Sequence, residues 1–272
     1  MRALPEQTIL ITGATDGLGR ALALELARAG ATLLLHGRDD ARGQATLAQI
    51  RDQSGNDRLH WYRADLSDLR EVRRLAAEIG RDRERLDVLV SNAGIGTVVP
   101  GGGRRQESAQ GHELRFAVNY LAGFLLTRLL QPLVVSSAPA RIIHVASAGQ
   151  APIDFDDVML TRRYSGMQAY CQSKLAQIMF TFDLAEQLAA QKVAANALHP
   201  ATYMPTKIVA NPISSIADGV RATARLITEP ELDAVTGRYY DGTREATAHM
   251  LAYDPLARRR LRELSERLTA AA

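Results

Sequence analysis

The chain has 272 residues, of which 46% are apolar and 23% charged. This composition is ordinary for a globular protein and excludes a disordered or fibrous chain. The net charge of only +3, from 33 basic and 30 acidic residues, argues against a nucleic-acid partner. Only three of the basic residues are lysines, Lys174, Lys192 and Lys207. Each therefore raises the question of what arginine could not do there.

Cysteine content and apolar runs indicate where the protein works. Cys171 is the only cysteine, so no intrachain disulfide can form, and we expect a reducing, cytoplasmic location. The first apolar strand is expected near Thr8, which leaves no room for a secretory leader. The longest apolar stretch, from Leu121 to Val135, contains an arginine, a glutamine and a proline. We predict a buried helix there, too short and too polar to span a bilayer.

Apolar strands alternate with amphipathic helices along the chain. The predicted strands are 8–12, 31–35, 58–63, 86–90, 141–145, 193–198 and 237–240, and the predicted helices are 18–29, 40–53, 68–79, 111–135, 167–190 and 214–228. Leucines at 256, 261, 264 and 268 predict a further amphipathic surface helix. Near-continuous apolar strands separated by helices predict a parallel sheet covered on both faces. The fold class is therefore α/β, a doubly wound sheet of about seven strands in one domain over residues 1–272.

A glycine-rich turn joins the first strand to the first helix, with the sequence Thr12-Gly13-Ala14-Thr15-Asp16-Gly17-Leu18-Gly19. Glycines there let the backbone approach a pyrophosphate, and the helix N-terminus supplies free N–H groups. The spacing, Gly-x-x-x-Gly-x-Gly, differs from the commonest dinucleotide fingerprint. An ordinary strand–helix turn is the alternative, but the position at the first crossover favours a dinucleotide site. The residues assigned to it are Gly13, Thr15, Asp16, Gly17, Leu18 and Gly19.

Four further motifs follow in order. Asn92-Ala93-Gly94 follows the fourth strand, Asn119 lies in the long helix, Ser147 follows the fifth strand, and Tyr170-Cys171-Gln172-Ser173-Lys174 lies on the next helix. With the glycine turn, these motifs strongly resemble the short-chain dehydrogenase/reductase family over nearly the whole chain. The resemblance implies a Rossmann-type domain that binds NAD(P), in an enzyme that acts on CH–OH or C=O groups.

The same resemblance assigns catalytic roles. Tyr170 and Lys174 are four residues apart and so share one face of a helix. A phenol has an ordinary pKa of about 10, which we expect the Lys174 ammonium and the positive ring of the oxidised cofactor to lower. By resemblance, Tyr170 is the general acid/base, and Lys174 tunes it and binds the nicotinamide ribose. Ser147 holds the substrate carbonyl, and Asn119 orders a water that relays protons to Lys174.

The end of the second strand bears on which nicotinamide cofactor binds. NAD enzymes usually place an acid there for the ribose hydroxyls, whereas this strand ends in His36-Gly37-Arg38. The resemblance is to NADP-preferring members, so we expect Arg38 to grip the 2′-phosphate and NADP to be preferred over NAD. Pairing of Arg38 with Asp39 or Asp40 is the alternative. Asp16 argues against NADP, because some NADP enzymes of the family carry a basic residue there.

The remaining cofactor contacts also rest on the resemblance. Ala201 replaces the glycine that usually follows Pro200, and alanine does not easily adopt a positive φ, so this turn is expected to differ slightly. No cluster of histidines and cysteines suggests a metal. The residues expected at the cofactor, besides the glycine turn, Arg38, Tyr170 and Lys174, are Asp65, Leu66, Asn92, Ala93, Gly94, Pro200 and Thr202, with Thr206 as the alternative to Thr202.

Two segments resemble the retinol-dehydrogenase-like and protochlorophyllide-reductase-like branch: a long path from Ser147 to Tyr170, and Thr236 to Tyr240. Retinol dehydrogenases of the family often carry an apolar N-terminal anchor, which we do not expect here. The substrate is expected between loop 96–103, segment 148–166 and the region after the sixth strand. Arg104-Arg105 is interpreted as a solvated pair, with attraction of an acidic substrate as the alternative.

The predicted function is NADP(H)-dependent hydride transfer to or from a small to medium carbonyl or alcohol. The alternative is a catalytically idle NADP-binding scaffold or redox sensor, which would need only the glycine turn. The complete set Asn119, Ser147, Tyr170 and Lys174 favours the enzyme. Family members commonly form homodimers or homotetramers through two long helices, and either is possible here unless the inserted segment obstructs it.

Overall fold

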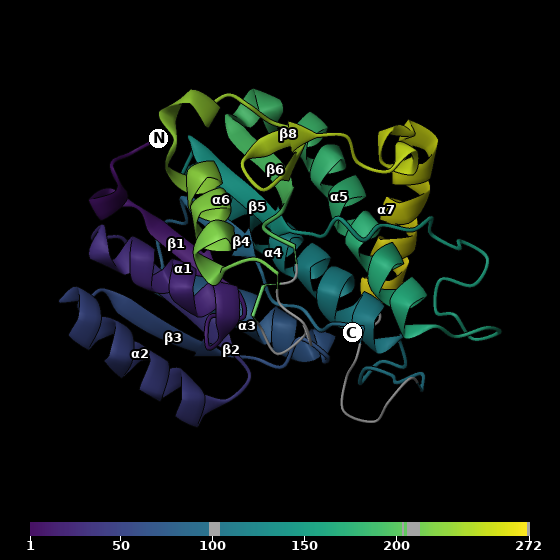
Figure 1. Ribbon diagram of the computed structural model, residues 1–272, viewed down its shortest axis with the longest axis horizontal. Helices are drawn as coiled ribbons and strands as arrows, with labels where there is room; N and C mark the ends of the chain where they lie inside the picture. The colour runs from purple at the N-terminus through teal and green to yellow at the C-terminus, as the bar shows by residue number, and fades with distance from the viewer. Residues whose placement is uncertain (98–103, 203, 206–212, 271–272) are drawn as a thin grey trace.

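One twisted sheet organises the computed structural model, which describes residues 1–97, 104–202, 204–205 and 213–270. The strand order is β3-β2-β1-β4-β5-β6-β7-β8 (Figure 1). All neighbours pair in parallel except β7 and β8. From β1 the chain adds β2 and β3 on one side and then β4 to β7 on the other. This is the strand order of a doubly wound dinucleotide-binding sheet. The strands are β1 (Thr8–Ile11), β2 (Thr32–Gly37), β3 (Leu59–Arg63), β4 (Val88–Ser91), β5 (Ala140–Val145), β6 (Val193–His199), β7 (Arg238–Asp241) and β8 (Arg244–Ala246).

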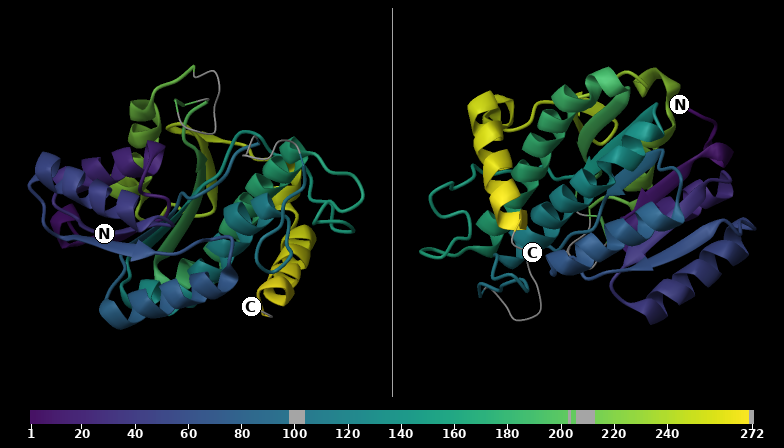
Figure 2. Two further views of the ribbon diagram at one scale, coloured as in Figure 1. Left: turned by 90° about the horizontal axis from the view of Figure 1, so that it is seen from below. Right: turned by 180° about the vertical axis from the view of Figure 1, so that it is seen from behind.

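Helices cover both faces of the sheet, as predicted (Figure 2). Helices α1, α2 and α6 pack on one face and α3, α4 and α5 on the other, and each face has its own buried apolar cluster. The strands are buried on both faces, which explains their almost uninterrupted apolar sequence. The helices are α1 (Gly17–Arg28), α2 (Asp40–Ser54), α3 (Leu69–Asp82), α4 (Ala122–Ser136), α5 (Gly166–Leu188), α6 (Ile216–Thr228) and α7 (Pro255–Ala270).

Short turns of helix complete the fold: the 3₁₀ turns η1 (Leu4–Glu6), η3 (Ala189–Gln191), η4 (Pro230–Leu232) and η5 (Met250–Tyr253), and the π-turn η2 (Phe116–Leu121). The eighth strand was not predicted, because β8 has only three residues. It pairs with β7 through a turn at Gly242, whose φ is +57°.

The C-terminal helix α7 lies against α5, outside the layer that touches the sheet (Figure 1). Its buried side includes Leu261, which is 1% exposed, whereas Leu256 is 65% exposed. The predicted amphipathic helix is therefore present, but not all four leucines share its buried face.

The long apolar helix departs from the prediction in two ways. It begins at Leu114 instead of Gly111 and passes through η2 before continuing as α4. Counted from Phe116 to Ser136, it is long and apolar enough to cross a bilayer, so the expectation of a helix too short and too polar was wrong. Within the protein, 56% of an 18-residue apolar stretch of this span is buried, and the span packs against α3 and α5.

Candidate active site

The glycine turn is closed by backbone contacts that leave no room for side chains. Gly13 and Gly17 have φ of +68° and +49°, in the left-handed region that favours glycine. A Cβ atom on Gly13 would lie 2.9 Å from the Ala93 Cα, and one on Gly19 would collide with the Gly13 carbonyl. The loop after β4 therefore sits directly against the turn after β1.

Thr12, quoted in the motif but not assigned a role, ties these two loops together. Its Oγ1 accepts hydrogen bonds from the backbone N–H groups of Asn92, at 2.9 Å, and Ala93, at 3.0 Å. In return, Asn92 Nδ2 donates to the Thr12 carbonyl at 2.8 Å. Asn92 and Ala93 thus brace the glycine turn, and their predicted contact with a cofactor stays a prediction.

His36 supports the same turn from β2, a role that the sequence did not reveal. The Gly13 N–H donates to His36 Nδ1 at 3.3 Å, so Nε2 carries the ring proton and donates to the Ala64 carbonyl at 3.1 Å. Burial lowers the pKa of His36 to about 4, which keeps the ring neutral and Nδ1 able to accept. The ring thereby links the turn after β1 to the chain after β3.

Asp16 begins helix α1. Its Oδ1 accepts from the Gly17 N–H at 2.8 Å, which satisfies one of the free donors at the helix start. Its Oδ2 lies 3.2 Å from Arg42 Nη2 in an ion pair. The acidic charge that argued against NADP is therefore offset by a guanidinium at the start of α2.

Arg38 lies exposed just after β2. Its guanidinium forms no hydrogen bond or ion pair with any residue that the structure describes; only its carbonyl is bonded, to Arg63 Nε. The two expected competitors are engaged elsewhere: Asp39 accepts from the Arg42 N–H and Asp40 from Trp61 Nε1. The pairing of Arg38 with either acid is thus not observed.

The Trp61 ring packs against Gly37 at the end of β2. A Cβ on Gly37 would lie 2.6 Å from the Trp61 ring and 3.0 Å from Thr15 Cγ2, so the β2 end, the glycine turn and β3 meet there. After β3, the Asp65 carboxylate accepts from the Ser67 N–H and hydroxyl at 2.9 and 2.8 Å. Two predicted contact residues, Leu18 and Leu66, are only 5% and 7% exposed, so their side chains serve mainly the core.

Asn119 lies inside the π-turn η2, where one extra residue per turn displaces the helix register. Its Oδ1 accepts from the Ile95 N–H at 2.8 Å, and its Nδ2 donates to the Ile95 carbonyl at 3.1 Å and to Ser173 Oγ at 3.0 Å. A Cβ on Gly94 would lie 3.3 Å from Asn119 Oδ1. The amide therefore holds the loop after β4 close to α5.

Lys174 is 5% exposed and lies between α5 and the sheet. Its Nζ donates to the Val145 carbonyl at 3.0 Å and to Gln177 Oε1 at 2.9 Å. A Cβ on Gly94 would lie 3.6 Å from Nζ, so the amine also borders the loop after β4. Burial lowers the pKa of Lys174 to about 7.

Tyr170 and Ser147 meet beside Lys174. Lys174 Nζ lies 5.8 Å from the centroid of the Tyr170 ring. Burial raises the pKa of the Tyr170 phenol above its ordinary value, and a hydrogen bond with Ser147 offsets this only in part. The lowering expected from Lys174 is not found, because the amine is bonded elsewhere and desolvation disfavours the phenolate. Tyr239 Oη donates to the Ser147 carbonyl at 3.1 Å and so anchors the chain after β5.

The turn after β6 closes the far side of the site. Pro200 is buried and Thr202 exposed, and Thr202 Oγ1 is 3.0 Å from His199 Nε2. Among the described residues other than glycine, positive φ occurs at Leu160 and Lys192, so the turn forms without a left-handed Ala201. The alternative nicotinamide contact, Thr206, lies outside the described residues, as does Lys207.

Arg115, which forms a buried ion pair with Glu113 at 3.6 Å, joins the two segments expected around the substrate. Arg115 is fully buried; its Nε donates to the Gly96 carbonyl at 2.9 Å, its Nη2 to the Thr97 carbonyl at 2.7 Å, and its Nη1 to Tyr164 Oη. Tyr164 Oη in turn donates to Glu113 at 3.1 Å. The loop after β4 is thus fastened to segment 148–166.

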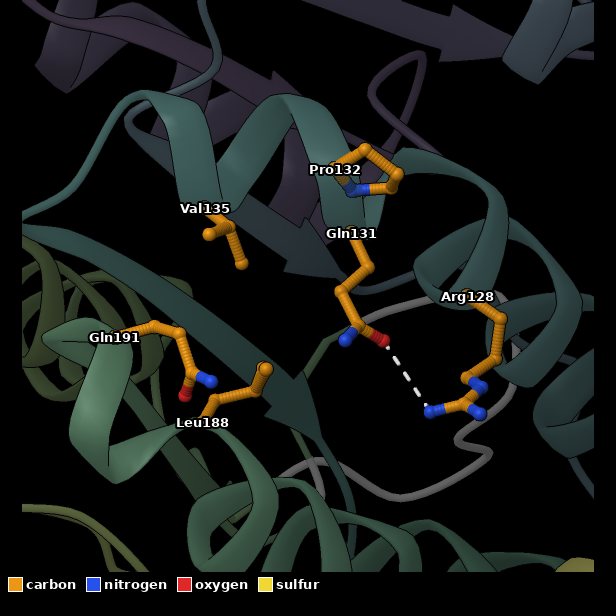
Figure 3. A pocket seen from close by; sticks show the side chains of 6 residues that line it. All are labelled: Arg128, Gln131, Pro132, Val135, Leu188 and Gln191. Carbon is orange, nitrogen blue, oxygen red and sulfur yellow. Dashed lines mark hydrogen bonds between the residues drawn. The ribbon is translucent and has the colours of Figure 1, made fainter.

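Other features lie outside this constellation. Arg105 pairs with Glu107 and donates to the Met159 carbonyl at 2.8 Å. No group of three or more possible metal ligands occurs in the part of the chain that the structure describes. A shallow cavity lies between the C-terminal ends of α4 and α5, at the sheet edge opposite the glycine turn (Figure 3). It is lined by Arg128, Gln131, Pro132, Val135, Leu188 and Gln191.

Comparisons with known proteins agree with this arrangement. A family model described as short chain dehydrogenase matches residues 7–215. Human retinol dehydrogenase 13 is 35% identical, over 97% of this chain and 85% of that protein. Human retinol dehydrogenase 14 is 34% identical, over 96% and 85%.

Solved structures show the same likeness. An uncharacterised protein from Mycobacterium paratuberculosis superposes with a TM-score of 0.78 at 30% identity, over 97% of this chain and 94% of that one. A short chain dehydrogenase from Shigella flexneri, crystallised with NADP, gives a TM-score of 0.70 at 25% identity, over 87% and 97%.

Proposed function

The chain belongs to the short-chain dehydrogenase family and is an NAD(P)-dependent oxidoreductase, and we propose that it interconverts a carbonyl and an alcohol with NADP(H). The observation that carries the proposal is the meeting of Ser147, Tyr170 and Lys174 at the carboxyl edge of the sheet. The glycine turn opens at the same edge, where ligands of parallel α/β sheets bind. A scaffold or redox sensor would need no such acid–base set.

The residues present fit a nicotinamide dinucleotide. Gly13 and Gly19 let the turn pack tightly against itself and the loop after β4, where a Cβ would collide, and the N-terminus of α1 offers backbone donors to the pyrophosphate. Gly94 and Lys174 would hold the nicotinamide ribose, and Thr202 the carboxamide. When bound, the cofactor donates or accepts the hydride; the protein must position the substrate and move the proton.

A preference for NADP over NAD is part of the proposal. The Arg38 guanidinium is exposed and unpaired among the described residues, which suits a 2′-phosphate. Arg42 stands nearby and neutralises Asp16, so the local field no longer opposes a phosphate. The relative from Shigella flexneri was crystallised with NADP.

In reduction, we assign proton donation to the carbonyl oxygen to Tyr170, while the Ser147 hydroxyl holds that oxygen in place. The phenol is protonated near pH 7, which is the form that donates, although burial raises its pKa and so makes it a weaker acid. Lys174 would return a proton to Tyr170 after turnover, and we propose that Lys174 is itself reprotonated from solvent through a water ordered by Asn119. In oxidation the same groups act in reverse, and the Lys174 ammonium must then favour the phenolate.

The substrate is proposed to be an apolar aldehyde, ketone or alcohol of small to medium size. Met167, one turn before Tyr170 on α5, is 59% exposed, and its Sδ is 3.7 Å from Cys171 Sγ. Met250 is 80% exposed and follows His249, whose N–H donates to Gln150 at 2.7 Å. Met167 thus places an exposed apolar side chain one turn from Tyr170, and the similar human proteins are named retinol dehydrogenases.

The direct test follows absorbance of the reduced nicotinamide with panels of aldehydes, ketones and alcohols. Wild type is expected to turn over at least one of them, and Tyr170→Phe to lose at least about 100-fold, the usual range for a general acid or base. Tyr62→Phe is the matched control, because Tyr62 lies on β3 and its phenol oxygen accepts a hydrogen bond from Arg83 Nε at 3.0 Å. Wild-type turnover in Tyr170→Phe would refute the mechanism, and cofactor binding without turnover of any compound would favour the scaffold.

Cofactor preference is tested by binding, with Trp61 as the reporter, since it is the only tryptophan and its ring lies against Gly37, the residue before Arg38. Arg38→Ala is expected to weaken NADPH binding at least about tenfold, the loss of one charge-assisted contact of about 1.5–3 kcal/mol, and to leave NADH binding unchanged. Arg51→Ala, whose guanidinium pairs with Asp57 at the far end of α2, is the control. Equal NADPH affinity in Arg38→Ala and wild type would refute the phosphate clamp.

Location and assembly stay predictions. The cytoplasmic location rests on the single cysteine. A homodimer or homotetramer through α4 and α5 has to accommodate α7, which lies against α5 (Figure 1).

A further inference from the structure

Gln177 is a buried amide one turn beyond Lys174 on α5. It is 2% exposed, and its Oε1 accepts from Lys174 Nζ at 2.9 Å. Its Nε2 makes no hydrogen bond with any described residue. Among the described residues, the side chain therefore has one polar contact, and that contact is with the proposed catalytic lysine.

Such an amide is costly as a packing residue. A buried donor without a partner costs about 1–3 kcal/mol, and a methionine of similar length would fill the space without that cost. The neighbours Leu175, Ala176 and Ile178 are all fully buried and apolar. The one interaction that offsets the cost is the hydrogen bond to Lys174.

We propose that Gln177 is a positioning residue, whose amide oxygen holds the Lys174 amine toward Gly94 and the cofactor side of the site. This inference rests on the role proposed above for Lys174. An ammonium has three N–H donors. Val145 and Gln177 accept two of them, and the third is left for a ribose hydroxyl.

The charge of this acceptor also matters. The two acceptors of Lys174 are neutral, a backbone carbonyl and an amide, so they favour the ammonium without locking it in an ion pair. The titratable groups around it are Tyr170 on α5, His144 on β5 and His199 at the end of β6. Burial lowers the pKa of both histidines, so they stay neutral near pH 7. Gln177 is thus the side chain most able to keep Lys174 protonated there.

The test compares Gln177→Met, which removes the acceptor at similar volume, with Gln177→Glu, which makes it anionic. NADPH affinity is measured from pH 5.5 to 9.5 by Trp61 fluorescence, and kcat and KM over the same range. Losing the ammonium at high pH is expected to weaken binding. We expect this alkaline limb to move down by about one pH unit in Gln177→Met, a tenfold change in proton affinity, and to move up in Gln177→Glu.

Gln172→Met is the matched control, since this buried amide on the same helix donates to the Val158 carbonyl at 2.7 Å instead. Its limb is expected to stay at the wild-type pH. The inference would be overturned if the pH at which NADPH affinity falls were the same in wild type and both Gln177 variants. It would also be overturned if this pH moved in the same direction in both variants. Lys174→Met distinguishes failure of the proposed function from failure of this inference. Full activity in Lys174→Met contradicts the proposed function. Loss of activity in Lys174→Met, with unchanged pH dependence in both Gln177 variants, contradicts only the role of Gln177.

Discussion

Acid is expected to destabilise the cofactor turn through His36. The ring is 2% exposed and bonded at both nitrogens, and burial lowers its pKa from 6.5 to about 4. Since the folded-state pKa is the lower one, the stability that the neutral ring contributes is complete above pH 6.5 and is lost as the pH falls toward 4. A gap of about 2.5 pH units, at about 1.4 kcal/mol each, makes this loss about 3 kcal/mol.

Urea unfolding followed by Trp61 fluorescence between pH 7 and 4 measures this term. In His36→Leu, the free energy of unfolding should be lower at pH 7 by about 1–3 kcal/mol, because the Gly13 N–H loses its acceptor. Its decline toward pH 4 should be shallower than in wild type by about 3 kcal/mol.

His144→Leu provides the comparison, since burial lowers the pKa of His144 to about 3 and its ring bonds Thr181. Both variants should have the shallower decline, but only His36→Leu should weaken NADPH binding at pH 7. The reasoning would be refuted if the free energy of unfolding of His36→Leu fell between pH 7 and 4 by as much as that of wild type.

Three further substitutions test the site. Lys174→Arg keeps the charge, but a planar guanidinium cannot replace a buried three-donor amine, so turnover should fall at least about 100-fold; near-wild-type turnover would contradict the assignment. Gly19→Ala should abolish cofactor binding and lower the melting temperature, because its Cβ meets the Gly13 carbonyl. Gly80→Ala, with nothing within 4 Å of the new atom, should instead stabilise helix α3 by up to about 1 kcal/mol, and equal melting temperatures for the two would contradict the steric argument. Tyr164→Phe removes the hydroxyl that bonds both Arg115 and Glu113. We therefore expect KM for the substrate to rise more than kcat falls, and an unchanged KM would contradict this expectation.

The fold was predictable because its signals are local. A strand such as Ile9-Leu10-Ile11 is apolar on both faces, since helices cover both. Helix α1 starts where an acid can cap it, at Asp16. The hairpin strand β8 escaped prediction, because Arg244–Ala246 has neither an apolar alternation nor enough length to show one.

The sequence predicted which residues would meet, but not their contacts. The order of motifs named Ser147, Tyr170 and Lys174 as the proposed catalytic set, which the structure brings together, whereas the roles proposed for His36 and Gln177 depend on partners that only folding places beside them. A signal was nevertheless present: each is a polar residue in an otherwise apolar buried segment, and buried polar groups need partners. The sequence shows that a partner is required without showing which one.

Burial, more than charge, sets the protonation of the proposed catalytic pair. It raises the pKa of Tyr170 and lowers that of Lys174 to about 7, so both changes favour the neutral forms. A neutral phenol is the form that donates a proton to a carbonyl, whereas accepting one from an alcohol requires the phenolate and hence a charged Lys174. The proposed reduction would therefore use the phenol in its neutral form, whereas the proposed oxidation would need a group that keeps Lys174 as the ammonium. Gln177 is the only side chain among the described residues that accepts a hydrogen bond from it.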